Sequence, residues 1–142
     1  MFGSEKMFGI IDHFQKVYMG KSNNNPNIEK STFFSKSITQ NIEFFKQSFQ
    51  NSADLSIRYL NVSGTQSAII TISGLVDKNV LTQSVVNHII FCETSIENSV
   101  EKYKYIKDNI ISSVDQTEVS TLEDAINAIA SGNAIFAMND CD

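Results

Sequence analysis

The sequence predicts an α/β domain in which helices flank a small mixed β-sheet of about four strands. Three observations carry this prediction. Helical and strand-like patterns of apolar residues alternate along residues 35–142, the order that is typical of an α/β layer. Residues 67–72 are apolar on both faces over part of their length, as in a central strand covered by helices. The chain has 142 residues, 42% of them hydrophobic, which is enough for one domain with its own core.

We expect the chain to divide at residue 34. In residues 5–18 the apolar side chains recur at spacings of three and four, which predicts an amphipathic helix. The charges of this segment cancel, so we expect the helix to pack on its own domain or on another subunit rather than on anionic lipid. Residues 21–30 have the Asn-rich, polar composition of a flexible linker. Residues 1–34 are thus expected to form this helix and linker, and residues 35–142 the compact α/β domain.

A second helix is expected from residue 35 or 36 to residue 50, because one of its faces would carry Ile38, Ile42, Phe45 and Phe49. Apolar and polar residues alternate over residues 55–62, which is the period of a half-buried strand. Residues 63–66 have the composition of a hairpin loop. The first hairpin therefore places a half-buried strand beside the buried central one.

Further elements are expected in the second half of the chain. Apolar spacing indicates helices over residues 82–92 and 99–110, and a short strand is expected within residues 114–120. A buried strand is expected over residues 134–138.

The helix before that last strand has the clearest end signals of the chain. Thr121 and Asp124 have the spacing of a capping box, and Gly132 stands where a helix C-cap is expected.

Composition narrows the possible partners and compartments. Eleven basic and sixteen acidic residues give a formal net charge of -5, so we expect no nucleic-acid partner. The apolar runs are far shorter than the ~20 residues that span a bilayer, and the N-terminus lacks the pattern of a secretion signal. Cys92 and Cys141 lie far apart, which suits a reducing compartment better than a disulfide framework. We therefore expect a cytoplasmic-type soluble domain without a membrane span.

The side chains that could act in catalysis or bind a metal do not form a recognisable motif. His88 and Cys92 are four residues apart on an expected helix, but zinc needs three or four ligands and no second His/Cys pair is present. The isolated glycines do not form a phosphate-binding loop. Glu93, Glu97 and Glu101 recur at the spacing of one solvated helix face. We therefore predict no catalytic residue, metal ligand or cofactor.

The stretch over residues 67–78 is the most informative about function. Its strand breaks at Gly74, whose backbone can adopt conformations closed to other residues, and opposite charges follow at Asp77 and Lys78. Arg58 places a fork-shaped donor, able to grip a carboxylate, within the preceding strand. On these physical grounds we predict Arg58, Gly74, Asp77 and Lys78 as ligand or interface residues.

Three segments carry a resemblance to a known family. They are NIEFFKQSFQNSADLSIR (residues 41–58), SGLVDK (residues 73–78) and EDAINAIASGNAIF (residues 123–136). In this order they resemble the soluble N-terminal region of the A subunit of bacterial spore germinant receptors, the GerA family. The resemblance covers about residues 36–142.

The resemblance implies a receptor with several parts. Proteins of this family have a soluble N-terminal region of two α/β subdomains followed by a membrane-spanning region. They act with B and C subunits in the inner membrane of dormant spores and respond to small nutrients, amino acids or sugars. By resemblance, this chain is the first subdomain, its partners are the B and C subunits and the rest of the A subunit, and the parent protein lies in the spore inner membrane. The family continues beyond the position of Asp142, so we expect an excised piece or a truncated relative.

Three functional hypotheses follow. The leading one is a non-enzymatic sensing or signalling module that contacts a ligand, the next subdomain or another subunit near Gly74. A small α/β enzyme with dispersed polar site residues would use His88 as general base, in a cleft beside a second titratable group. A purely structural scaffold that joins subunits would expose a large apolar patch.

Overall fold

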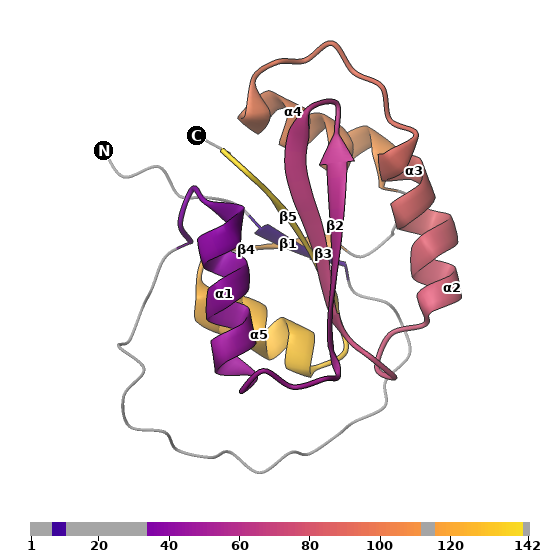
Figure 1. Ribbon diagram of the computed structural model, residues 1–142. Helices are drawn as coiled ribbons and strands as arrows, with labels where there is room; N and C mark the ends of the chain where they lie inside the picture. Colours follow the sequence, from indigo (N-terminus) through magenta and orange to yellow (C-terminus); the bar gives the residue numbers. More distant parts are fainter. Residues whose placement is uncertain (1–6, 11–33, 112–115, 141–142) are drawn as a thin grey trace.

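The computed structural model describes residues 7–10, 34–111 and 116–140. Within these residues, five strands form one sheet in the order β2-β3-β5-β1-β4 (Figure 1). The strands are β1 (Met7–Ile10), β2 (Leu55–Val62), β3 (Thr65–Ile72), β4 (Gln116–Val119) and β5 (Ala134–Met138). The helices are α1 (Ile38–Ser48), α2 (Lys78–Leu81), α3 (Asn87–Ile90), α4 (Ser99–Tyr105) and α5 (Leu122–Ala130), with π-helical segments η1 (Thr82–Val86) and η2 (Ile106–Ile110).

The α/β fold class is confirmed, with helices flanking a small sheet. The sheet differs from the prediction in direction, because all four strand pairings are antiparallel rather than mixed. Apolar periodicity shows which side chains face a core, but it carries no information on the direction in which a strand enters the sheet. The chain passes through three helical stretches and β4 between β3 and β5, and it re-enters the sheet antiparallel to β3.

The additional strand comes from the N-terminal segment. β1 lies between β5 and β4 and pairs antiparallel with both, so the helix prediction for residues 5–18 is wrong at Met7–Ile10. Pairing with β1 satisfies the backbone groups along an edge of β5 that would otherwise be open, and this non-local gain overrides a local helical pattern. The remaining residues of the expected helix and the expected linker lie outside the described residues, so the division at residue 34 stays a prediction.

Helix α1 confirms the second predicted helix. Ser37 is its N-cap and accepts a hydrogen bond from the Gln40 backbone N–H. Ile38, Ile42 and Phe45 are buried, as their spacing predicts.

The β2–β3 hairpin has a tighter turn than predicted. Ser63 and Gly64 alone connect the strands, because Val62 already pairs with Thr65. Both turn residues have positive φ, 46° at Ser63 and 87° at Gly64, which matches the right-handed twist of the flanking strands.

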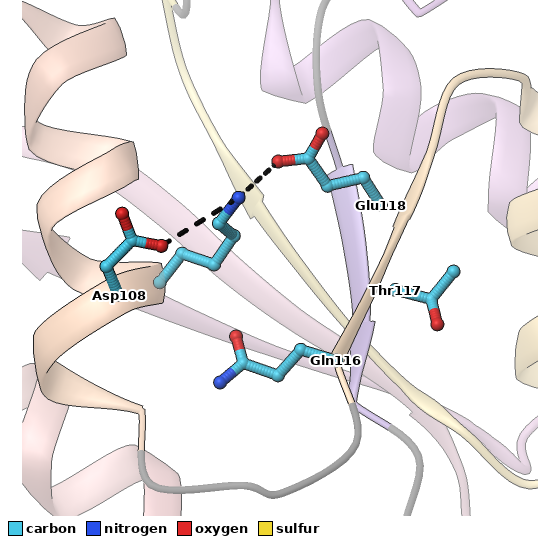
Figure 2. A pocket seen from close by; sticks show the side chains of 5 residues that line it. Asp108, Gln116, Thr117 and Glu118 are labelled. Carbon is cyan, nitrogen blue, oxygen red and sulfur yellow. Dashed lines mark hydrogen bonds and ion pairs between the residues drawn. The ribbon is translucent and has the colours of Figure 1, made fainter.

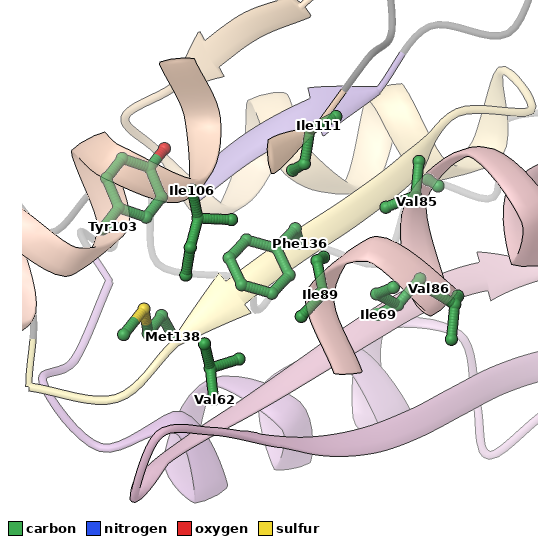
Figure 3. Packing of buried hydrophobic residues seen from close by; sticks show 11 residues of the cluster. Val62, Ile69, Val85, Val86, Ile89, Tyr103, Ile106, Ile111, Phe136 and Met138 are labelled. Carbon is green, nitrogen blue, oxygen red and sulfur yellow. The ribbon is translucent and has the colours of Figure 1, made fainter. Parts of the chain in front are cut away.

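Helices cover both faces of the sheet. α1 and α5 lie on one side of the hairpin and α2, α3 and α4 on the other (Figure 1). The side chains of β3 alternate between the two layers, with Ala68 and Ile70 in the α1/α5 core and Ile69 in the other. Figure 3 shows this second core, in which Phe136 of β5 lies among side chains of the helical layer. β3 is thus an interior strand covered on both faces, as the sequence predicts, although β5 is the middle strand of the sheet.

Two helical stretches form the second layer. The first begins at Lys78, four residues before the predicted start, and continues without interruption through η1 and α3. The second, α4 with η2, confirms the helix predicted over residues 99–110.

The acidic residues predicted to share a helix face do not do so. Only Glu101 lies on a helix, because Asn98 caps α4 and the segment before it is irregular. Glu93, Glu97 and Glu101 are nevertheless all exposed, as expected for solvated carboxylates.

The end of the chain follows the sequence signals closely. Thr121 caps α5 by accepting a hydrogen bond from the Asp124 backbone N–H at 3.1 Å, and Gly132 ends the helix with φ 89°. All five residues of β5 are buried.

A buried lysine braces the hairpin turn. Lys102 of α4 is only 3% exposed, and its Nζ donates to the Ser63 carbonyl at 3.0 Å and to Thr65 Oγ1 at 2.8 Å. The segment between α3 and α4 holds the same turn, because the Ser63 hydroxyl donates to the Cys92 carbonyl and accepts from the Thr94 N–H. Nothing in the sequence distinguishes Lys102 from its exposed neighbours.

We expect Lys102→Met to lower the free energy of unfolding by about 1–3 kcal/mol, because it leaves two part-buried acceptors without a donor. Urea unfolding at 25 °C measures this. The exposed Lys104 of the same helix provides the control, and Lys104→Met should change stability by no more than about 0.5 kcal/mol. Equal losses in the two variants would show that Lys102 does not brace the turn.

The buried Cys92 thiol predicts a pH dependence of stability. Burial raises its pKa above the ordinary value of 9.0, and the Lys102 charge opposes that rise. The folded protein therefore keeps the thiol protonated at a pH where the unfolded chain has released the proton. The contribution of Cys92 to the free energy of unfolding is fully present below about pH 9 and is lost as the pH rises through the raised pKa.

Urea unfolding between pH 7 and pH 10 of the wild-type chain and of Cys92→Ala tests this. The wild-type chain should lose more stability than the variant above pH 9, and parallel curves would contradict the prediction. Cys141 is present in both proteins, so its ionisation cancels.

Candidate functional site

The chain turns a sharp corner where β3 ends, over the segment Ser73 to Lys78, which we call the SGLVDK corner. The Ser73 N–H donates to the Asp54 carbonyl at 2.7 Å, and the Leu75 N–H donates to the Ile72 carbonyl at 3.2 Å. Gly74 is exposed with φ 87°, and open space surrounds the position that a Cβ would take. Its backbone conformation, rather than a lack of room, is what requires glycine.

Asp77 has a structural task at this corner. Its Oδ1 accepts hydrogen bonds from the backbone N–H groups of Asn79 at 2.9 Å and Val80 at 3.1 Å, so it is the N-cap of α2. This cap explains why the helix begins before its predicted start. Lys78 follows as the first residue of α2 and is exposed.

Two of the predicted site residues line one pocket. Arg58 of β2 and Lys78 of α2 both border a cavity of about 130 Å³ between the hairpin and the helical layer. Asp77 and Gly74 are not among its lining residues. The full lining is Ser56, Arg58, Ile69, Thr71, Lys78, Leu81, Thr82 and Val86.

The pairing register explains why a pocket forms here. Ser56 lies opposite Thr71 and Arg58 lies opposite Ile69, so these four residues share one face of the hairpin. Farther along β2, the same face carries Val62, which is fully buried in the core. Toward the SGLVDK corner, this face of the hairpin therefore carries the polar side chains of Ser56, Arg58 and Thr71.

The charged residues of this pocket are all positive. Arg58 and Lys78 are its only charged lining residues, and both are cationic. Neither side chain forms a hydrogen bond or ion pair with another residue of the described chain. The pocket thus carries two cations without an ion-pair partner among the described residues, in a chain whose formal net charge is -5.

A second pocket, of about 300 Å³, differs in this respect. It is lined by Lys107, Asp108, Gln116, Thr117 and Glu118, as Figure 2 shows. Lys107 Nζ lies 2.6 Å from Glu118 Oε1 and 3.9 Å from Asp108 Oδ1, and the hydrogen bond to Glu118 raises the pKa of Lys107. The cation is therefore satisfied within the pocket. The sequence does not signal this group, because η2 and β4 meet only in the folded chain.

His88 and Cys92 form neither of the sites considered for them, a general base in a cleft and a metal site. His88 is exposed and lines neither of these two pockets, whereas Cys92 is buried. Among the described residues, no three His, Cys, Asp or Glu side chains gather as potential metal ligands. The enzyme hypothesis thus gains no support from the position of His88.

The three segments that carry the family resemblance converge at the SGLVDK corner. The hydrogen bond from Ser73 to Asp54 joins the corner to the end of the first segment. Gly132, in the third segment, approaches so closely that a Cβ there would lie 3.3 Å from the Leu75 carbonyl oxygen. Segments about 20 to 60 residues apart in sequence therefore meet at one exposed point of the fold.

None of the helices in the described part of the chain has the length and apolar character needed to cross a membrane.

Two substitutions separate the role of Asp77 as a helix cap from the effect of its negative charge. We expect Asp77→Ala to lower the free energy of unfolding by about 1 kcal/mol through loss of the cap. Asp77→Asn should cost much less, because asparagine caps helices equally well without a charge. Urea unfolding of both variants measures this, and equal losses would show that the carboxylate charge, not the cap, carries the stability.

Comparison with known proteins assigns the chain to a family. The model of the Bacillus/Clostridium GerA spore germination protein family matches residues 43–142. The fold is similar to the crystal structure of the N-terminal domain of the A subunit of the Bacillus megaterium spore germinant receptor GerK3, with a TM-score of 0.60 and 15% sequence identity. The similarity covers 79% of this chain and 46% of that one, so the chain spans about half the length of the solved domain. A search of the curated proteins found no match. The protein belongs to the GerA spore germination family.

Proposed function

We propose that this chain is a sensing or signalling domain of a spore germinant receptor A subunit. It takes part in recognition of a nutrient germinant, or it passes the signal to the membrane part and to the B and C subunits. Family membership and the fold similarity support the receptor assignment. The convergence of the three family-like segments at the SGLVDK corner is the observation that carries the sensing or signalling role.

The construction of the corner suits signal transmission. It is exposed at Gly74, yet it is tied to the start of β2 through Asp54 and packed against the end of α5 at Gly132. A partner that displaces the corner therefore acts on the hairpin and on α5 together. Exposed segments of a fold can shift locally without unfolding the core.

The receptor assignment also supports a location for the parent protein. We propose that it lies in the spore inner membrane, where this domain contacts the rest of the A subunit. The solved GerK3 domain continues beyond the part that this chain matches, which leaves a neighbouring domain as the nearest candidate partner.

A scaffold role is a second candidate, favoured by one observation. Phe91 is 79% exposed and its neighbour Ile90 43% exposed at the end of α3. Adjacent exposed apolar side chains fit a contact that joins subunits. Sedimentation of the wild-type chain and of Phe91→Ser distinguishes this role, because it requires self-association that the variant loses.

We expect Asp77→Asn and Lys78→Gln, introduced into the receptor that contains this chain, to slow germination of spores. The measurement is release of dipicolinate after addition of nutrients, with receptor levels checked by immunoblot. Asp77→Asn keeps the helix cap, so a defect reports on the charge at the corner.

Glu97→Gln and Glu101→Gln are the matched controls, since both carboxylates are exposed and remote in sequence from the corner. If these substitutions slow germination as much as the corner variants do, the proposed role of the corner is wrong.

A further inference from the structure

We propose that the pocket between Arg58 and Lys78 binds a small oxyanion, with the carboxylate of a small organic molecule as its ligand. Neither cation forms an ion pair or hydrogen bond with another described residue. Long cationic side chains on a protein surface commonly pair with nearby carboxylates, and this chain has sixteen acidic residues. Two unpaired cations at one cavity therefore mark a site suited to an external anion.

The lining supplies the rest of an anion site. Ser56, Thr71 and Thr82 bring hydroxyl groups, which can donate to oxyanion oxygens. Ile69 and Val86, which are 3% and 1% exposed, form an apolar floor. Such a floor lowers the local dielectric and strengthens attraction between the cations and an anion.

The volume of the cavity limits the size of the group that can bind. Its volume of about 130 Å³ is well below the ~300–1,000 Å³ of pockets that enclose drug-sized molecules. It therefore accommodates a small anionic group rather than a whole sugar. The guanidinium of Arg58 can hold such a group through two parallel hydrogen bonds, whereas Lys78 acts as a point charge.

Binding at this position has a mechanical consequence. Arg58 belongs to β2 and Lys78 to the first turn of α2, so an anion held by both would link the hairpin to the helix that leaves the SGLVDK corner. The inference rests on the proposed sensing function for its biological meaning, because the bound anion would brace the corner that we propose to carry the signal.

The test is a titration of the full chain followed by amide shifts in NMR spectra. Sodium acetate and sodium phosphate are the two probes, at constant ionic strength maintained with sodium chloride. We expect saturable shifts at Ser56, Arg58, Thr71 and Thr82. Tighter binding of acetate than of phosphate assigns the ligand as a carboxylate, and the reverse order overturns that assignment in favour of phosphate.

Variants then locate the site. Arg58→Gln should weaken acetate binding at least about tenfold, since it removes a charge-assisted hydrogen-bond donor. Arg58→Lys should give an intermediate affinity, because it retains the charge but loses the fork. Lys104→Gln removes an exposed cation that does not line the pocket and should leave binding unchanged.

Two results would overturn the inference. One is the absence of shifts at the pocket amides with either probe beyond those that chloride produces. The other is equal affinity in Arg58→Gln and Lys104→Gln, which would mean that binding follows net charge alone. These outcomes are separate from the germination assay: if oxyanion binding fails while Asp77→Asn still slows germination, only the pocket inference falls. If binding occurs while the corner variants germinate normally, the proposed signalling role falls instead.

Discussion

The side-by-side pairing of β3 and β5 is the constraint on which the rest of the structure depends. Ile69 pairs opposite Phe136 and Ile70 opposite Ile135, and all four side chains are buried. Because successive side chains of a strand point to opposite faces, two such strands need a helical layer on each side. Their outer edges also need backbone partners, which β2 provides for β3 and β1 for β5.

The polar corner and the pocket follow from this arrangement. β3 leaves the core at Ile72, and the chain must reverse at Gly74 to bring α2 back over the sheet. Toward the far end of the hairpin, the helical layer covers this face of β2 closely enough to bury Val62. Near the corner it leaves space, which Arg58 and Lys78 border. The candidate site thus lies where the helical layer leaves part of the hairpin face uncovered.

The two ends of the hairpin use positive charge in different ways. At the turn, the buried Lys102 is held by the Ser63 carbonyl and Thr65 Oγ1, so its charge stabilises the fold. Near the corner, Arg58 and Lys78 are exposed and have no partner among the described residues. A buried cation with fixed acceptors is a structural group, whereas exposed cations at a cavity remain available to a ligand.

The sequence by itself determined the elements whose signals are local. The spacing in α1, the strand at β2 and the cap at Thr121 are each signalled by residues within a few positions of one another, and the structure confirms all three elements. Within β2, however, burial does not alternate strictly, because Tyr59 is exposed. The same holds for the family, because the three characteristic segments can be recognised in the linear chain.

Only the tertiary structure decided what depends on distant residues. It made a strand of Met7–Ile10, set every strand pairing antiparallel and placed Lys102 beneath the hairpin turn. It also brought Arg58 and Lys78 to one pocket, although the sequence had suggested each of them separately. The physical reason is that backbone pairing and burial are satisfied between segments far apart in the chain, and local periodicity carries no record of which segments meet.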